Sequence, residues 1–424
     1  QLQNDLPPTR RSSMATSLRL QLRPDDPANV LAPIVQDYRE HFEARRYQAK
    51  RVRRYVASVF HFGDWLRSED WAVQNVDEAV VGRFISDHLP NCTCPRPVQR
   101  NPIINRAALN HLIHILYAKG IIRRPVADPI TRELALFDEK MTEVWGLAQG
   151  TRDHRCRIIR RLLKAQFGSG PIDPTSISPS AIRSFVLDDA TWSRSTIRVM
   201  AGAVRCYLRH RKLLGDNVTD LMHAVPQPAC WGQTKLPEAL SGDELEQLFR
   251  SFDAACPSRR RGYAMVRCLA DLGLRSSEVV RLSLDDIDWQ AGTIRITAGK
   301  GRRADVLPLP RATGEAIADY LLHERPKTTC RQIFVRHVAP LGEPVGRRVV
   351  QKAVHAAYQR LGWDRTRVHI LRHTLATRLV NAGTPMKQIA DVLRHRSIVT
   401  SATYTRVDSS RLTAVALCWP GSVA

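Results

Sequence analysis

The sequence contains no long hydrophobic run. Among its 424 residues there is no stretch of about 18 consecutive apolar residues, and the N-terminal region lacks an apolar segment of signal-peptide length. These absences argue against a transmembrane helix and against secretion. We therefore predict a soluble cytoplasmic protein that makes no membrane contact.

The sequence also lacks the cysteine pattern of a disulfide-stabilised domain, because its nine cysteines are odd in number and mostly scattered. One local group, His88, Cys92 and Cys94 followed by His111 and His114, offers ligand types that zinc accepts. Its spacing matches no zinc finger known to us. Reduced core cysteines and surface histidines explain the group more simply, so we predict no metal site.

Acidic residues are scarce relative to basic ones. Asp and Glu number 41 against 64 Lys and Arg, which gives a formal net charge of +23. Such a chain attracts polyanions, so nucleic acid is the predicted partner. A ribosomal-type protein or one that binds a membrane surface would carry a similar charge, and charge alone does not separate these classes.

The length predicts more than one hydrophobic core. Residues 1–29 are polar and aperiodic, which is typical of a flexible basic tail. Residues 30–126 and 127–228 show helical periodicity with recurring cations, and we predict two helical DNA-binding domains there, the second of core-binding type. A stretch rich in proline and glycine then precedes a last domain at residues 237–424.

The last domain mixes helix and strand signals. Ser241 and Glu244 form a capping box, so a helix is expected to begin at Gly242. Residues 293–298 and 304–309 alternate in strand fashion around a glycine-rich turn and predict a β-hairpin. The predicted fold is therefore mostly α with a small antiparallel β-sheet in the last domain (α+β).

Basic side chains recur along three predicted helices, at residues 47–66, 152–167 and 193–213. A run of charge on one helix usually marks a solvated face. Recurrence on several helices of one chain favours contact with backbone phosphates. The arginines predicted to bind DNA are Arg51, Arg53, Arg54, Arg157, Arg161, Arg194 and Arg198.

Several residues of the last domain have the chemistry of a phosphate site. Arg275 follows a glycine turn at a predicted helix start, where a cation can reach an oxyanion. Lys300 lies at the tip of the predicted hairpin. His369 and Arg372 are three residues apart and share one helix face. Taken singly, Arg275 suits a surface arginine equally well, and Gly-Lys-Gly is usually simple turn chemistry.

Two further residues follow towards the C-terminus. His395 comes after the predicted helices of this region, and Tyr404 follows nine residues later among small polar residues. The absence of bulky neighbours in the sequence leaves the tyrosine hydroxyl accessible for reaction.

In this order and spacing, Arg275, Lys300, His369, Arg372, His395 and Tyr404 resemble the active site of the tyrosine recombinase (phage integrase) family. The resemblance covers roughly residues 237–410. The chain differs at Arg394, where many members carry glycine before the histidine, and at Ile370, where many carry Asp or Gly. Neither difference removes a functional group.

The resemblance implies how these residues act. Tyr404 would attack phosphorus to form a 3′-phosphotyrosine, and Lys300 would protonate the departing 5′-oxygen. His369 would assist proton transfer at the tyrosine, and His395 would donate a further hydrogen bond. Two fixed guanidiniums, from Arg275 and Arg372, suit the charge on the phosphate oxygens. The resemblance implies no cofactor, neither a metal nor ATP.

The same resemblance implies the setting. It suggests helical N-terminal domains and an integrase-type catalytic domain that clamp double-stranded DNA, with a homo-oligomer, expected to be a tetramer, on the DNA. Sister recombinases or accessory factors, a role in a mobile element and association with a bacterial nucleoid are further expectations. A type IB topoisomerase-like activity and a catalytically silent accessory protein remain alternatives, although the complete set of six residues argues against the second.

Overall fold

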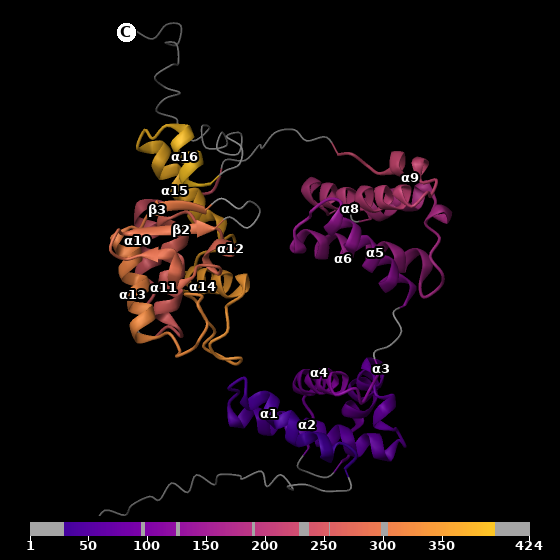
Figure 1. Ribbon diagram of the computed structural model, residues 1–424. Coiled ribbons are helices and arrows are strands. Elements are labelled where there is room, and N and C mark those ends of the chain that lie inside the picture. Colours follow the sequence, from indigo (N-terminus) through magenta and orange to yellow (C-terminus); the bar gives the residue numbers. More distant parts are fainter. Residues whose placement is uncertain are drawn as a thin grey trace, which may run out of the picture. The chain divides into compact units, whose positions relative to one another are not determined.

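The computed structural model describes residues 29–94, 98–123, 128–188, 191–228, 237–253, 255–297 and 304–394. This part of the chain is mostly helical with one three-stranded antiparallel sheet, so the predicted α+β class is confirmed (Figure 1). No described helix combines the length and the apolar character that a membrane crossing needs. Of the predicted basic tail, only Asn29 is described.

The chain divides into two compact units. One contains residues 1–125 with 338–341, and the other contains 126–337 with 342–424. The described hydrophobic residues of the second unit form a core within 130–225 and two further clusters within 240–393. The division of the chain into the three predicted domains stays a prediction.

The first unit is helical and packs around aromatic side chains. Tyr38, Phe42, Phe62 and Phe84 are fully buried in one core. Asn101 caps the last helix, because its side chain accepts hydrogen bonds from the next backbone N–H groups. The elements are α1 (Ala32–Glu43), α2 (Ala49–Ser68), η1 (Val73–Asn75), α3 (Glu78–Arg83), the π-helix η2 (Phe84–His88), η3 (Leu89–Asn91) and α4 (Pro102–Ala118).

The second unit begins with another helical segment. Its core includes the buried rings of Phe137 and Tyr207. The Tyr207 hydroxyl donates to Glu133 Oε1 at 2.8 Å, and Arg211 pairs with the same carboxylate at 3.1 Å, so this buried charge is compensated. The elements are α5 (Pro129–Glu143), α6 (Gln149–Phe167), η4 (Pro174–Ser176), α7 (Pro179–Leu187), α8 (Arg194–Leu213) and α9 (Thr219–Ala224).

The remainder of the second unit carries the sheet, and the capping box predicted before it is confirmed. Ser241 Oγ accepts from the backbone N–H of Glu244 at 3.1 Å, and the Glu244 carboxylate accepts from the backbone N–H of Ser241 at 2.8 Å. The elements are α10 (Gly242–Arg250), α11 (Arg259–Asp271), α12 (Ser276–Val279), η5 (Leu284–Asp286), β1 (Ile287–Asp288), β2 (Thr293–Thr297), β3 (Ala304–Pro308), α13 (Arg311–His323), α14 (Arg347–Arg360), α15 (His369–Asn381) and α16 (Met386–Val392).

The predicted hairpin is also present. Strands β2 and β3 pair antiparallel, with Thr293 opposite Pro308 and Thr297 opposite Ala304. Strand β1 pairs with the other edge of β2 and makes the sheet three-stranded. The alternation of apolar and polar residues did not predict β1, because this strand is only two residues long. Ile294 and Ile296 point from β2 into the core. The hairpin tip, including Lys300, lies outside the described residues.

Candidate active site

Arg275 follows a turn that only glycine accommodates without strain. Helix α11 ends at Asp271, and Gly273 then adopts a φ of +58°. A Cβ at this position would lie 2.9 Å from side-chain atoms of both Leu375 and Leu393. The turn leaves Arg275 as the N-cap of α12 with its side chain 38% exposed, so the guanidinium remains reachable from solvent.

Glu278 holds Arg275 in place. Its carboxylate accepts from Arg275 Nη1 and from the Arg275 backbone N–H, each at 2.8 Å. Burial by itself raises the pKa of Glu278, but the backbone hydrogen bond from Arg275 and the charge of Arg394 outweigh it, and the net pKa is lowered. Glu278 is therefore an ionised, buried anchor for the guanidinium.

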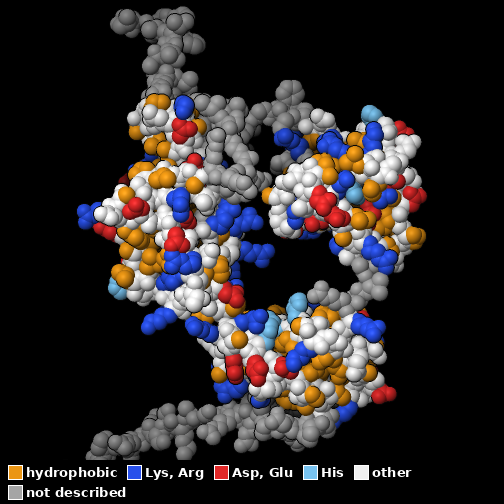
Figure 2. All heavy atoms as spheres, in the orientation of Figure 1, with side chains coloured by type: hydrophobic (Ala, Val, Ile, Leu, Met, Phe, Trp, Pro, Cys, Tyr) orange, Lys and Arg blue, Asp and Glu red, His pale blue; other side chains and the backbone are white. Residues whose placement is uncertain are grey.

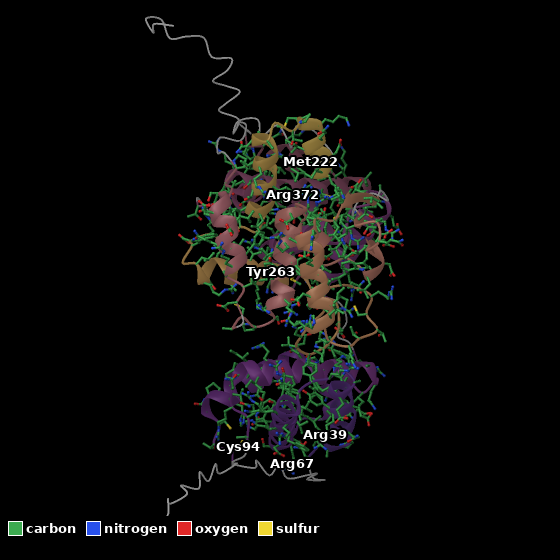
Figure 3. The ribbon with its side chains drawn as sticks, turned by 90° about the vertical axis from the view of Figure 1, so that its left-hand side faces the viewer. Arg39, Arg67, Cys94, Met222, Tyr263 and Arg372 are labelled. Atoms are coloured by element: carbon green, nitrogen blue, oxygen red, sulfur yellow. The ribbon has the colours of Figure 1, made fainter. Side chains whose placement is uncertain are left out.

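His369 and Arg372 occupy the first turn of α15, as their spacing predicted. Arg372, labelled in Figure 3, is 5% exposed and donates to the backbone carbonyls of Gly273 and Leu393. His369 lies at the surface of the unit. Partial desolvation, then the charges of Arg372 and Arg275, lower its pKa, so its imidazole is neutral near pH 7.

The structure thus brings three of the six predicted residues together. The contact of Arg372 with Gly273 places the first turn of α15 beside the turn that precedes Arg275. The effect of both guanidiniums on His369 reflects the same proximity. Lys300, His395 and Tyr404 lie outside the described residues, so their positions stay predictions.

Arg394 is part of the same site, which the sequence did not reveal. It adopts a φ of +53°, the left-handed conformation that glycine at this position would favour. Its side chain is 4% exposed and its Nη2 lies 3.1 Å from Glu278 Oε2. It also donates to the carbonyls of Gly273 at 3.3 Å and Val392 at 2.8 Å. One carboxylate therefore pairs with both Arg275 and Arg394.

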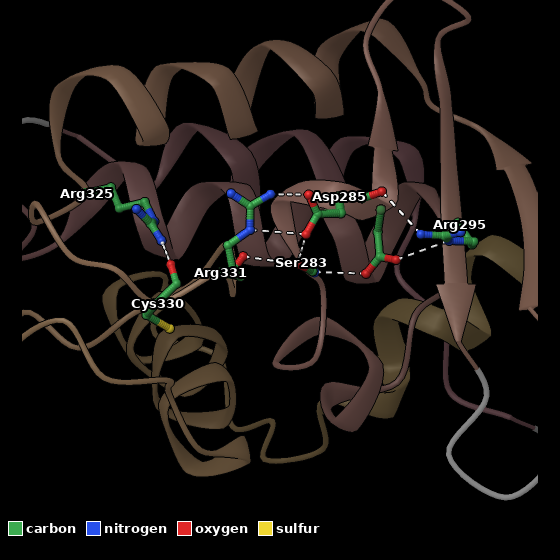
Figure 4. A network of polar contacts seen from close by, with 7 residues as sticks. Ser283, Asp285, Arg295, Arg325, Cys330 and Arg331 are labelled. Atoms are coloured by element: carbon green, nitrogen blue, oxygen red, sulfur yellow. Dashed lines mark hydrogen bonds and ion pairs between the residues drawn. The ribbon is translucent and has the colours of Figure 1, made fainter.

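The acidic turn after α12 is occupied by structural ion pairs (Figure 4). Asp285 accepts from Arg331, with Nε at 3.1 Å, and Asp286 accepts from Arg295 at 3.4 Å. Asp286 also accepts from the backbone N–H of Ser283 at 2.9 Å. These contacts fix η5 against the start of the sheet, and the carboxylates are already engaged by cations.

The seven arginines predicted to bind DNA are all exposed on α2, α6 and α8. Within the described residues, Arg51, Arg53, Arg54, Arg157 and Arg194 pair with no carboxylate. Figure 2 shows Lys and Arg side chains across the visible surface of both units. These exposed cations remain available to an external polyanion.

Other cations on α6 and α8 are structural instead. Arg155 lies 2.9 Å from Cys206 Sγ, and Arg205 donates to the carbonyls of Val225 and Pro226. Together with Arg211, which pairs with buried Glu133, they hold the helices of this segment together. The recurrence of basic residues along a predicted helix could not distinguish these inward-facing arginines from the exposed ones.

Comparisons with known proteins decide the family. Residues 238–411 match the model of the phage integrase family. A protein of Sinorhizobium fredii (strain NBRC 101917 / NGR234) named as an integrase/recombinase, y4rA, is 32% identical over 405 residues, which is 93% of this chain and 96% of that protein. The chain belongs to the phage integrase family. It is a tyrosine-type DNA recombinase/integrase by this relationship.

Further comparisons are consistent with this family assignment. Tyrosine recombinase XerC of Halalkalibacterium halodurans is 31% identical and is matched over 56% of this recombinase and 80% of its own length. In fold, the chain is similar to the XerH site-specific recombinase, whose crystal structure is a post-cleavage complex with a palindromic difH substrate. That likeness has a TM-score of 0.52 at 18% identity and covers 70% of this chain and 98% of the XerH chain.

Proposed function

We propose that this recombinase cleaves and rejoins DNA at specific sites through a 3′-phosphotyrosine at Tyr404, and that it integrates or excises a mobile element. Family membership supports site-specific recombination as the broader activity. The observation that carries the finer proposal is the convergence of Arg275, His369 and Arg372 at the junction of α11, α12 and α15.

The two guanidiniums are the phosphate clamp of the proposed site. A phosphodiester under attack carries negative charge on its non-bridging oxygens, and preorganised N–H donors stabilise it best. Arg275 is fixed by Glu278, and Arg372 is fixed by two backbone carbonyls. Both donors are therefore oriented before substrate arrives, and His395 would add a third hydrogen bond.

The covalent step exchanges one phosphate ester bond for another, so the energy of the phosphodiester bond is retained in the phosphotyrosine intermediate. The Tyr404 oxygen forms a bond to phosphorus while the bond from phosphorus to the 5′-oxygen breaks. The tyrosine proton passes towards His369, which its lowered pKa leaves neutral and able to accept it. The ammonium of Lys300 gives a proton to the departing 5′-oxygen. Attack of a 5′-hydroxyl on the phosphotyrosine then reverses these transfers and reseals a strand.

Double-stranded DNA is the proposed partner. The exposed arginines on α2, α6 and α8 would neutralise backbone phosphates, which position a protein on the duplex. A solved Tn1549 transposon integrase in complex with a circular intermediate DNA, with a TM-score of 0.50 and 18% identity, has a similar fold. A homotetramer on DNA, with sister recombinases or accessory factors, completes the proposal.

A suicide substrate tests the covalent step. Nicked duplexes from the DNA that flanks the coding sequence are incubated with the full chain and with Tyr404→Phe, and the products are separated under denaturing conditions. A covalent protein–DNA band with the unmodified chain alone supports the proposal. A band of equal strength with Tyr404→Phe would exclude this nucleophile.

Reactions with supercoiled plasmid and with paired sites separate the alternatives. A topoisomerase-like enzyme would relax supercoiled plasmid without joining two different duplexes, whereas a recombinase joins paired sites. A silent accessory protein would shift the mobility of the DNA in a native gel and form no covalent band. Arg311→Ala, which removes an exposed cation of α13, serves as a control that keeps full activity.

A further inference from the structure

Two histidines and two cysteines of the first unit converge on one point. His61 lies in α2, His88 ends the π-helix η2, and Cys92 and Cys94 follow η3. One ligand-type atom of each residue lies within 4.8 Å of those of the other three. We propose that these four side chains bind one zinc ion, at a site separate from the recombination chemistry.

Three separations among the four atoms are close to those of a tetrahedral zinc site. His61 Nε2 lies 3.1 Å from His88 Nε2 and 3.3 Å from Cys92 Sγ, and Cys94 Sγ lies 3.5 Å from His88 Nε2. Zinc bonds of about 2.0 Å to nitrogen and about 2.3 Å to sulfur imply ligand separations of roughly 3.3 Å for two nitrogens and roughly 3.5 Å for nitrogen and sulfur. The observed distances agree with these edges.

The surroundings orient His61 towards such an ion. Its Nδ1 lies 3.1 Å from the carbonyl oxygen of Gln99, which can only accept, so Nδ1 carries the proton. Nε2 then directs a lone pair into the cluster, which is the tautomer a metal requires. The Gln99 carbonyl is held in turn by the fully buried Asn105, whose amide donates to it at 2.8 Å.

The backbone and the aromatic shell support the other ligands. Arg100 donates to the carbonyl of Cys94 at 2.7 Å, which fixes the loop that carries this thiol. Phe84 contacts both imidazoles, with ring centroids 5.1 Å from His61 and 5.3 Å from His88. Phe84 therefore packs against both histidine ligands, and two nitrogens with two sulfurs form a ligand set typical of structural zinc.

This proposal replaces the sequence-based interpretation. His88, Cys92 and Cys94 do come together, but neither His111 nor His114 joins them. His111 packs against Phe42 with ring centroids 4.8 Å apart, and His114 is exposed on α4. The fourth ligand type comes from His61, which is 27 residues before His88 and therefore outside any local motif.

The ion would link elements that lie far apart in the sequence. It would join α2 to the segment of η2 and η3 and, through the Gln99 carbonyl, to the start of α4. The first turns of α2 carry Arg51, Arg53 and Arg54. We infer that the zinc site braces the helix that presents these cations.

Metal analysis of the full chain tests the proposal. The chain is expressed with added zinc and purified under reducing conditions without a metal-affinity tag, and its zinc content is measured by mass spectrometry. We expect about one zinc per chain, and close to none in His61→Ala and Cys94→Ser. His114→Ala and Cys156→Ser, which alter a histidine and a cysteine outside the cluster, should retain the ion.

Cobalt substitution of the unaltered chain gives a test that does not depend on the folding of any variant. Co²⁺ in this site should show the visible bands of a tetrahedral ion together with thiolate-to-metal charge transfer. A chain that stays free of zinc after reconstitution while Cys92 and Cys94 are both open to alkylation would overturn the proposal. Bound cobalt without a thiolate band, or zinc retained by folded Cys94→Ser, would overturn it as well.

Discussion

The carbonyl oxygen of Gly273 accepts hydrogen bonds from the guanidiniums of both Arg372 and Arg394. One backbone atom thus joins the turn before Arg275 to the first turn of α15 and to the end of the described chain. Glu278 completes the arrangement by pairing with Arg275 and Arg394. The geometry of this site depends on a few buried polar contacts, and single substitutions should affect it strongly.

Arg394→Ala should impair both stability and cleavage. Removing one partner of a buried ion pair typically costs about 3–5 kcal/mol when the remaining charge is left unpaired. Glu278 keeps Arg275 as a partner, so we expect a loss below this range. Without Arg394, the Glu278 carboxylate is no longer held on one side, so it can shift together with the Arg275 guanidinium that it orients. We expect covalent cleavage to fall at least about tenfold, which corresponds to about 1.4 kcal/mol. Denaturant unfolding and suicide-substrate rates measure the two effects.

Two variants make this prediction specific. Arg394→Lys keeps a cation near Glu278 and should restore part of the cleavage rate. Arg311→Ala breaks an ion pair whose arginine is 92% exposed, and such pairs contribute little. If Arg394→Ala cleaved DNA as fast as the unmodified chain, the proposed positioning of Arg275 through Glu278 would be wrong.

Gly273→Ala should also be destabilising. The positive φ is strained for alanine, and the new methyl group would overlap Leu375 and Leu393. We expect a loss of roughly 1–3 kcal/mol in the free energy of unfolding. Gly82→Ala is the matched control, because Gly82 lies within α3 with nothing near its added Cβ, and alanine favours a helix by up to about 1 kcal/mol. Gly273→Ala should therefore lower the free energy of unfolding, and Gly82→Ala should raise it.

At the scale of the elements, local signals in the sequence predicted much of the fold. The capping box at Ser241, the hairpin of β2 and β3, and the shared first turn of His369 and Arg372 were all readable, because each depends on residues close in the chain. The two-residue strand β1 was missed, since so short a segment has no period to detect.

Contacts between distant residues were not predictable in the same way. Arg394 and Glu278 are 116 residues apart, and His61 and Cys92 are 31 residues apart. No local pattern links such pairs, because tertiary packing alone brings them together. The sequence therefore identified candidate chemical groups, and it could suggest that Glu278 orients Arg275, but it could not show that Arg394 pairs with Glu278 or that His61 completes the metal-ligand cluster.

Ser241→Ala should weaken the start of α10. The substitution removes the hydroxyl that accepts from the Glu244 backbone N–H, and losing such a cap costs about 1 kcal/mol. Ser241→Thr keeps the acceptor and should lose only a few tenths of a kcal/mol by the same ranking. Urea unfolding of the three proteins provides the comparison. Equal losses for alanine and threonine would show that the hydroxyl is not the stabilising group.

At the scale of the whole molecule, stability should fall in mild acid. His337 Nδ1 lies 2.8 Å from Ser258 Oγ and its Nε2 lies 3.4 Å from the Tyr320 hydroxyl; burial, then the charge of Arg261, lowers the pKa of His337 to about 4. The unfolded histidine titrates near about 6.5. Because the folded pKa is depressed, this contribution is fully present above about pH 6.5 and is lost progressively as the pH falls towards 4.

His337→Gln tests this pH dependence. Without the titrating group, the free energy of unfolding should fall less steeply between about pH 6.5 and pH 4, with a slope smaller by at most about 1.4 kcal/mol per pH unit for one proton. His154→Gln, which alters an exposed histidine of α6, provides the comparison. An unchanged slope in His337→Gln would show that other groups control the acid response.

The excess positive charge predicts a steep dependence of DNA affinity on salt, and the exposed arginines of α2 should account for part of it. Each phosphate contact contributes about 0.9 to the slope of log affinity against log salt, so replacing Arg51, Arg53 and Arg54 by alanine should reduce the slope by up to about 2.7. Replacing Arg250, Arg311 and Lys387 removes the same charge, but each already pairs with a carboxylate one helical turn away. If the α2 arginines contact phosphates, only the first triple variant flattens the slope. If net charge alone governs binding, the two variants behave alike.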